Sequence, residues 1–98
     1  MLELDERRLE RKLKKEVEAI GGWALKFVSP GKSGVPDRLI LLPGGTCFFV
    51  EVKAPDEKPR PLQKKRIREI TNLGTKVYVI DTNESLNRLL ENVRRLNE

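Results

Sequence analysis

The chemistry that this sequence can support depends on three charged residues, Asp37, Glu51 and Lys53. Side chains alternate between the two faces of a β-strand, so Glu51 and Lys53 share one face of the strand expected over 46–53. Asp37 begins the preceding strand, and a hairpin between the two strands brings it beside Glu51. Two adjacent carboxylates repel each other unless a proton or a cation lies between them. Because oxygen ligands without His or Cys select hard cations, the spacing predicts a site for Mg²⁺ or Mn²⁺.

Each of these residues also has a simpler interpretation. Glu51 and Lys53 can form an ion pair, which would satisfy both charges on a strand that helices cover. Asp37 follows Pro36 after a glycine-rich loop, where an aspartate commonly caps a turn or a strand edge. The residues alone leave these interpretations open beside the metal site.

A glutamine on the helix expected over 62–73 is a further candidate. Gln63 lies on the apolar stripe of this helix, and a buried amide there needs hydrogen-bond partners. A contact with neighbouring backbone explains the position as well as a role in the site does. Arg66 lies near the same stripe, so periodicity does not single out Gln63.

The helix expected over 4–20 offers two acidic candidates. Glu6 lies nearer the centre of the apolar stripe, and Glu10 lies at its margin. Spacing alone therefore favours Glu6, although most carboxylates on helices are simply solvated.

The composition excludes several classes of enzyme. The chain has 98 residues, no histidine and a single cysteine, Cys47. A Ser-His-Asp triad, a Cys-His pair, an HExxH zinc site, a histidine base and an internal disulfide are therefore excluded. No apolar run reaches the length of a membrane span, and the charged N-terminus does not resemble a signal peptide. We therefore expect a protein of the cytoplasm, or of the host cell's cytoplasm if the source is viral, without a membrane partner.

Periodicity and turn residues predict the elements that position these side chains. Helices are expected over 4–20, 62–73 and 83–96, and strands over 23–29, 37–42, 46–53 and 75–81. The order is α-β-β-β-α-β-α. One mixed sheet flanked by helices, in a single α/β domain spanning 1–98, is the simplest arrangement of these elements.

The charge balance points to a polyanionic partner. Lys and Arg number 20 against 15 Asp and Glu, which gives a net charge of +5 and a pI of about 9.6. A solvated surface charge is the simpler explanation for any one basic residue, but their clustering favours a collective role in binding phosphates. The polar and basic residues that flank the expected site are Lys26, Lys32, Ser33, Arg38, Lys58, Arg60, Lys64 and Lys65.

Three motifs in this order resemble the PD-(D/E)xK nuclease superfamily, and within it the virus-type replication-repair nuclease (VRR-NUC) family in its stand-alone form. They are Gly34-Val35-Pro36-Asp37-Arg38, Phe49-Val50-Glu51-Val52-Lys53 and Leu62-Gln63. The resemblance extends from about Glu10 to Asp81. It implies a restriction-endonuclease-like core and metal-dependent hydrolysis of DNA phosphodiester bonds.

The resemblance also assigns roles to single residues. Asp37 and Glu51 match the metal ligands, Lys53 the catalytic lysine, and Gln63 the glutamine of the following helix. We expect the backbone carbonyl of Val52 to complete the set of ligands for one or two ions. In related Holliday junction resolvases a glutamate of the first helix precedes a glycine at the spacing that separates Glu10 from Gly21. The resemblance therefore places Glu10 above Glu6, as a metal ligand bound directly or through water.

The expected function is that of a structure-selective endodeoxyribonuclease of DNA repair, acting on Holliday (four-way) junctions. A flap or nicking nuclease is one alternative, and a nucleic-acid-binding module without turnover is another. The intact set of Asp37, Glu51 and Lys53 argues against the module, because carboxylates without a cation repel DNA. A homodimer is expected, because symmetric cleavage of a junction needs two sites. Its interface is expected on the C-terminal helix or around Trp23.

Overall fold

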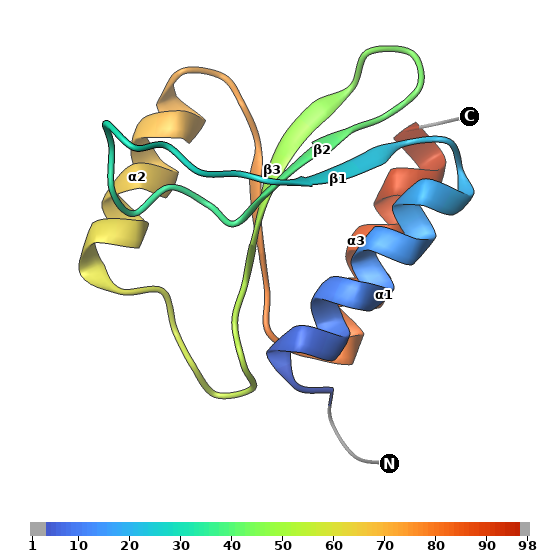
Figure 1. Ribbon diagram of the computed structural model, residues 1–98, viewed down its shortest axis with the longest axis horizontal. Helices are drawn as coiled ribbons and strands as arrows, with labels where there is room; N and C mark the ends of the chain where they lie inside the picture. Colours follow the sequence, from blue (N-terminus) through green and yellow to red (C-terminus); the bar gives the residue numbers. More distant parts are fainter. Residues whose placement is uncertain (1–3, 97–98) are drawn as a thin grey trace.

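The computed structural model describes residues 4–96, and the order of its elements is the α-β-β-β-α-β-α order predicted from the sequence (Figure 1). The strands are shorter than expected by one to three residues at one or both ends. The elements are α1 (Glu6–Ala19), β1 (Trp23–Lys26), β2 (Arg38–Leu41), β3 (Cys47–Val52), α2 (Pro61–Asn72), β4 (Val77–Ile80) and α3 (Asn83–Leu96).

The strands form one mixed sheet in the order β1-β2-β3-β4. The β1–β2 and β2–β3 pairs are antiparallel, and β3 and β4 are parallel. The turn between β2 and β3 contains Gly44 and Gly45 with φ of +90° and +95°, which only glycine adopts without strain. Since parallel neighbours need a crossover connection, α2 lies between β3 and β4 in the chain.

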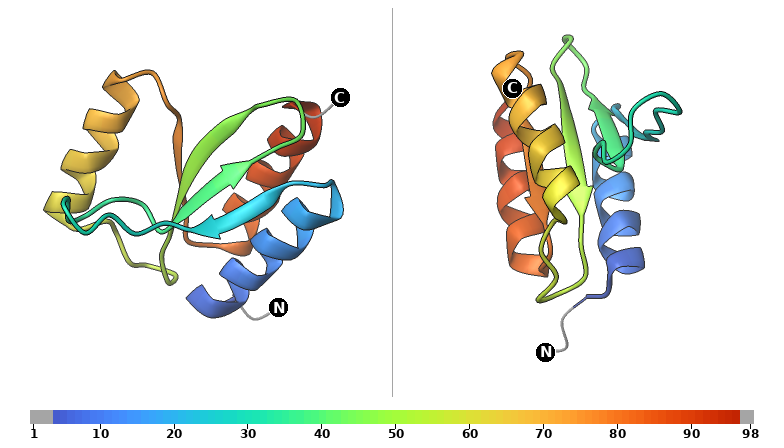
Figure 2. Two further views of the ribbon diagram at one scale, coloured as in Figure 1. Left: turned by 45° about the horizontal axis from the view of Figure 1, so that its top comes forward. Right: turned by 90° about the vertical axis from the view of Figure 1, so that its left-hand side faces the viewer.

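One face of the sheet packs against α1 and α3, which lie side by side, and α2 lies apart from them on the other side (Figures 1 and 2). Lys12 of α1 links the two helices, because its Nζ donates to Oδ1 of Asn83 at 2.8 Å and of Asn87 at 2.9 Å. The core between this helix pair and the sheet consists of Leu9, Leu13, Val17, Ala24, Ile40, Leu42, Phe48, Val50, Val52, Ile80, Leu86, Leu89, Leu90 and Val93.

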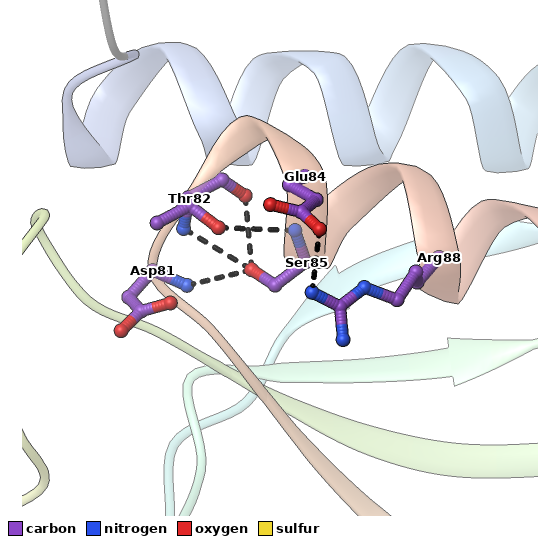
Figure 3. Close-up of polar contacts among 5 residues, drawn as sticks. All are labelled: Asp81, Thr82, Glu84, Ser85 and Arg88. Carbon is purple, nitrogen blue, oxygen red and sulfur yellow. Dashed lines mark hydrogen bonds and ion pairs between the residues drawn. The ribbon is translucent and has the colours of Figure 1, made fainter.

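The helix ends are fixed by local hydrogen bonds. Asp5 caps α1, since its Oδ1 accepts from the Arg8 amide at 2.9 Å. Thr82 and Ser85 form a reciprocal network at the start of α3 (Figure 3). Gly74 ends α2 with φ of +97°, as its place after the apolar run predicts.

The glycine-rich loop before β2 is anchored to α2. Arg66 of α2 donates from Nε to the Ser33 carbonyl at 2.8 Å. Gly34 has φ of +82° and lies so close to α2 that an added Cβ would stand 2.8 Å from Cγ of Leu62. Figure 1 shows this loop reaching across to α2. The loop therefore enters β2 at a fixed position, which fixes Asp37.

Among residues 4–96, no helix is both long and apolar enough to cross a membrane.

Candidate active site

Asp37 and Glu51 meet where β2 begins and β3 ends. Arg38 pairs with Val50 in the antiparallel register, so the next step of the register sets Asp37 opposite Glu51. The Asp37 carboxylate is also fastened to the neighbouring strand, because the Val52 amide donates to its Oδ2 at 3.1 Å. The expected convergence of the two acids is therefore present in the structure.

The Glu51 carboxylate is fully buried, and neither of its oxygens has a hydrogen-bond partner among the described residues. Burial raises the pKa of the Glu51 carboxyl to about 8, and the neighbouring Asp37 carboxyl adds to this shift. A buried carboxylate without donors is costly in the charged form. The two Glu51 oxygens therefore favour a bound cation or a proton, as expected for a carboxyl group that lies beside the carboxyl group of Asp37.

Lys53 follows β3 and is held by its backbone, since its amide donates to the Ile80 carbonyl at 2.9 Å. Its ammonium group lowers the pKa of Glu51, against the effects of burial and Asp37, so the two charges lie near each other. No ion pair joins Lys53 to Glu51 within the range 4–96. The simpler interpretation, in which an ion pair satisfies both charges, is not what the structure shows.

The two acidic candidates of α1 have different surroundings. Glu10 pairs with Arg38 at 3.2 Å, and Nη1 of Arg38 also donates to the Ala24 carbonyl at 3.1 Å. The pKa of Glu6 is raised, first by partial burial and then by the charge of Asp37. Glu10 thus contacts Arg38, the residue that follows Asp37. Glu6 interacts with the Asp37 carboxyl through charge, and no hydrogen bond joins the two among the described residues.

Gln63 is buried, as its place on the apolar stripe predicts. Its Oε1 accepts from the Arg60 amide at 2.8 Å and so caps the first turn of α2, where Pro61 also lies. The backbone contact that explained this amide without a site is therefore present, and a role in the site stays a prediction.

The residues expected to bind phosphates are placed in two ways. Seven of them are exposed, namely Lys26, Lys32, Ser33, Lys58, Arg60, Lys64 and Lys65. Arg38 differs, because its guanidinium group is occupied by Glu10 and by the Ala24 carbonyl and its side chain is only 13% exposed. The spacing of residues gave no signal for this pairing, which depends on how α1 packs against β2.

The donor set for a metal is small. In the described part of the chain, no three acidic or cysteine side chains stand close enough together to hold an ion. The pair of Asp37 and Glu51 fits Mg²⁺ or Mn²⁺, because both supply oxygen and the Glu51 oxygens accept no hydrogen bond from residues 4–96. A third protein ligand would come from the Val52 carbonyl or from the start of α1.

Comparisons with known proteins agree with this geometry. A curated protein named "Putative nuclease p44", from Acyrthosiphon pisum secondary endosymbiont phage 1, is 51% identical over 76 residues, which are 78% of this chain and 82% of that protein. A solved structure described as a VRR_NUC domain superposes with a TM-score of 0.82 at 34% identity, covering 88% of this chain and 94% of the other. The family model described as the VRR-NUC domain matches residues 3–84, and the chain therefore belongs to the VRR-NUC family of nucleases.

Proposed function

We propose that this nuclease is a Mg²⁺- or Mn²⁺-dependent endodeoxyribonuclease that acts on branched DNA, with the four-way junction as its substrate. The observation that carries the proposal is the Glu51 carboxylate, which is buried beside Asp37 and has no hydrogen-bond donor in the part of the chain that the structure describes. A protein that only binds DNA gains nothing from two converging carboxylates, because they repel phosphate. A nuclease uses them to hold the cation that its reaction requires.

Each residue of the site has a proposed role. Asp37, Glu51 and the Val52 carbonyl would hold the ion, with Glu10 bound to it directly or through water. The ion would polarise the scissile phosphate and make a water molecule a stronger nucleophile. Lys53 would neutralise the charge that develops on the phosphate, where a fixed cation has its largest effect. The carboxamide of Gln63 would keep Lys53 or the attacking water in place.

Proton transfer has few possible routes in this chain. The sequence contains no histidine, so a proton leaves through Lys53, through water or through the substrate phosphate itself. The pH dependence of the cleavage rate should therefore contain no step that belongs to the titration of an imidazole group.

The substrate would be held by phosphate contacts rather than by base contacts. The exposed residues Lys58 and Arg60 lie on the loop between β3 and α2, and the exposed Lys64 and Lys65 lie on the first turns of α2. Lys26 and Lys32 lie on the side of β1 and of the glycine-rich loop. Such contacts give affinity that falls steeply with salt and does not depend on sequence. Recognition would therefore follow the shape of the DNA.

A homodimer is proposed through the sheet face that α1 and α3 leave uncovered. Trp23 and Leu25 of β1 are 62% and 41% exposed on this face. Leu41 of β2 pairs with Trp23, and Cys47 of β3 pairs with Leu41, so both lie on the same face. On α3, Leu86, Leu89 and Leu90 are buried in the core instead, and only Leu96 at the end of the described helix is exposed. A second copy related by a twofold axis would cover the same side chains on both chains and supply a second site for the second DNA strand. Trp23→Lys should convert a dimer into a monomer in light scattering, and an unchanged mass would refute this interface.

One experiment tests the activity. Labelled four-way, flap and duplex DNA are incubated with Mg²⁺ or Mn²⁺ and with wild type, Lys53→Ala and Asp37→Asn. Lys15→Ala serves as the control, because Lys15 is an exposed lysine of α1 to which neither the site nor the proposed phosphate contacts assign a role. We expect metal-dependent cutting that both site variants reduce by at least about 100-fold and that the control changes little.

The other functions predict different outcomes of the same experiment. Cutting of flaps but not of junctions would favour a flap or nicking nuclease. Binding without cutting, unchanged by either site variant, would support a module without turnover. Equal losses in Lys15→Ala and Lys53→Ala would contradict the proposed site.

A further inference from the structure

Asp81 carries a carboxylate to which the proposed reaction gives no task. It directly follows β4, as Lys53 directly follows β3. The parallel register pairs Val52 with Ile80, so its next step sets Lys53 opposite Asp81. The ladder continues to this point, because the Lys53 amide donates to the Ile80 carbonyl at 2.9 Å. The two residues are therefore neighbours across the end of a parallel pair.

Strand alternation, continued one residue past β3 and β4, places both side chains on the same face of the sheet. Glu51 pairs with Val79, and side chains alternate along each strand, so Glu51, Lys53, Val79 and Asp81 point to one side. Neighbouring strands lie about 4.8 Å apart, which brings the Asp81 carboxylate within reach of a lysine ammonium group. Asp81 is also partly buried, so its carboxylate is only partly hydrated.

The start of α3 does not use this carboxylate. An aspartate before a helix commonly caps its first turn, but here Oγ1 of Thr82 accepts from the Ser85 amide at 3.0 Å. Oγ of Ser85 accepts in turn from the amides of Asp81 and Thr82, both at 3.1 Å. Figure 3 shows the Asp81 carboxylate turned away from this network. Within residues 4–96 it takes part in no hydrogen bond or ion pair, including one with Lys53.

A cation at Asp37 and Glu51 changes the surroundings of Lys53. Without the cation, an ammonium group beside Asp37 and Glu51 is attracted by the negative charge that these two carboxyl groups carry when ionised. A divalent ion bound to them replaces this attraction by repulsion at short range. Lys53 then needs another anion beside it to remain near the phosphate, and Asp81 is opposite it in the register.

We propose that Asp81 is a positioning residue, whose carboxylate holds the Lys53 ammonium group beside the scissile phosphate when the cation site is occupied. This inference rests on the proposed nuclease function. It differs from a role in DNA binding, because a carboxylate near phosphate weakens binding by repulsion. Its removal should therefore slow cleavage while the affinity for DNA stays the same or increases.

The test compares Asp81→Asn with Glu84→Gln. Glu84 lies three positions further along at the start of α3, is exposed, and among the described residues pairs only with Arg88, at 2.9 Å. We expect Asp81→Asn to lower the single-turnover rate constant at saturating junction DNA by about 10- to 100-fold. The dissociation constant for DNA, measured in Ca²⁺, should not rise, and the melting temperature should not fall. Glu84→Gln should match wild type in all of these measurements. Loss of stability, weaker DNA binding or an equal loss in Glu84→Gln would overturn the inference.

Two further measurements separate this inference from the function on which it rests. In a Lys53→Ala background, Asp81→Asn should cause no further loss, and an additional tenfold loss would refute action through Lys53. In crystals soaked with Mn²⁺, Nζ of Lys53 should lie within about 4 Å of the Asp81 carboxylate, and a greater separation would refute the contact. If wild type cuts no DNA, the proposed function fails, and the manganese-soaked structure alone decides whether Asp81 holds Lys53.

Discussion

The two faces of the sheet differ in what their side chains do. The face toward α1 and α3 buries Phe48, Val50 and Val52 of β3 in an apolar core. The face toward α2 carries Glu51 from the same strand, fully buried and without a hydrogen-bond donor among the described residues. It also leaves Trp23 of β1 62% exposed.

The difference separates stability from chemistry within a single strand. Alternation along β3 allows one side of the backbone to be stabilised by apolar contacts, while the other side bears a charge that the fold alone does not stabilise. The core therefore supports the position of a carboxylate that would be unfavourable without a ligand. Substitutions on the two faces should affect stability and activity in opposite ways.

The largest effect is expected for Glu51→Gln. The substitution keeps the shape of the side chain but removes the negative charge that the cation requires, so cleavage should fall by about 1,000-fold or more. The metal-free protein should melt at the same or a higher temperature at pH 8, because the buried charge is gone. Rates from gel assays and melting curves from circular dichroism measure the two effects. A variant that is inactive because it is unfolded would contradict the separation of stability and activity between the two faces of the sheet.

Leu13→Ala tests the opposite face. Leu13 is fully buried between α1 and the sheet, and its truncation should lower the free energy of unfolding by about 3 kcal/mol. Below its melting temperature the variant should retain most of its cleavage activity, since it leaves Asp37 and Glu51 in place. Urea unfolding and cleavage at low temperature measure the two quantities. A stable but inactive Leu13→Ala protein would show that the core does more than support the site.

The pH dependence of stability sharpens the same contrast. Glu51 has an ordinary pKa of 4.5 and a pKa of about 8 in the fold, where burial is the main cause. As the pH rises from 4.5 to 8, the unfolded chain releases this proton while the folded chain retains it, so stability decreases across that window. We expect the melting temperature of the metal-free protein to fall by more than about 10 °C between pH 5 and pH 8.5.

Two controls identify Glu51 as the source of that pH dependence. In Glu51→Gln this component of the pH dependence should disappear. Mg²⁺ or Mn²⁺ should raise the melting temperature of wild type more at pH 8.5 than at pH 5, because the cation competes with the proton for the carboxylate. A wild type whose stability rises through this window would contradict the raised pKa.

Much of the fold follows from local signals in the sequence. The Gly44-Gly45 turn predicts the hairpin, and the hairpin predicts that Asp37 stands opposite Glu51, which the register confirms. The end of β1 was predicted too far along the chain. Val28 continues the apolar run but is 77% exposed, because pairing with β2 ends near Phe27. Composition therefore predicts which segments form strands better than it predicts where their hydrogen bonds stop.

The site was less predictable where it depends on tertiary packing. The convergence of Asp37 and Glu51 needs only strand alternation and a short turn. The pairing of Glu10 with Arg38 depends on how α1 is rotated against β2, which no spacing reveals. The cap that Gln63 provides for α2 could have been predicted, because Pro61 and Gln63 occupy the first and third positions of that helix.

The smallest effect is expected at the start of α1, where the sequence left two acids open. Glu10 pairs with Arg38, the residue after Asp37, and is proposed to contact the cation directly or through water. Glu10→Gln should therefore lower both the affinity for Mn²⁺ and the cleavage rate by about tenfold. Glu6 acts on the site only through its charge, so Glu6→Gln should lower the same two quantities by about threefold or less. Calorimetric titration with Mn²⁺ and cleavage rates for the matched pair measure this. The reverse order of effects would assign the position to Glu6 and leave Glu10 as the structural partner of Arg38.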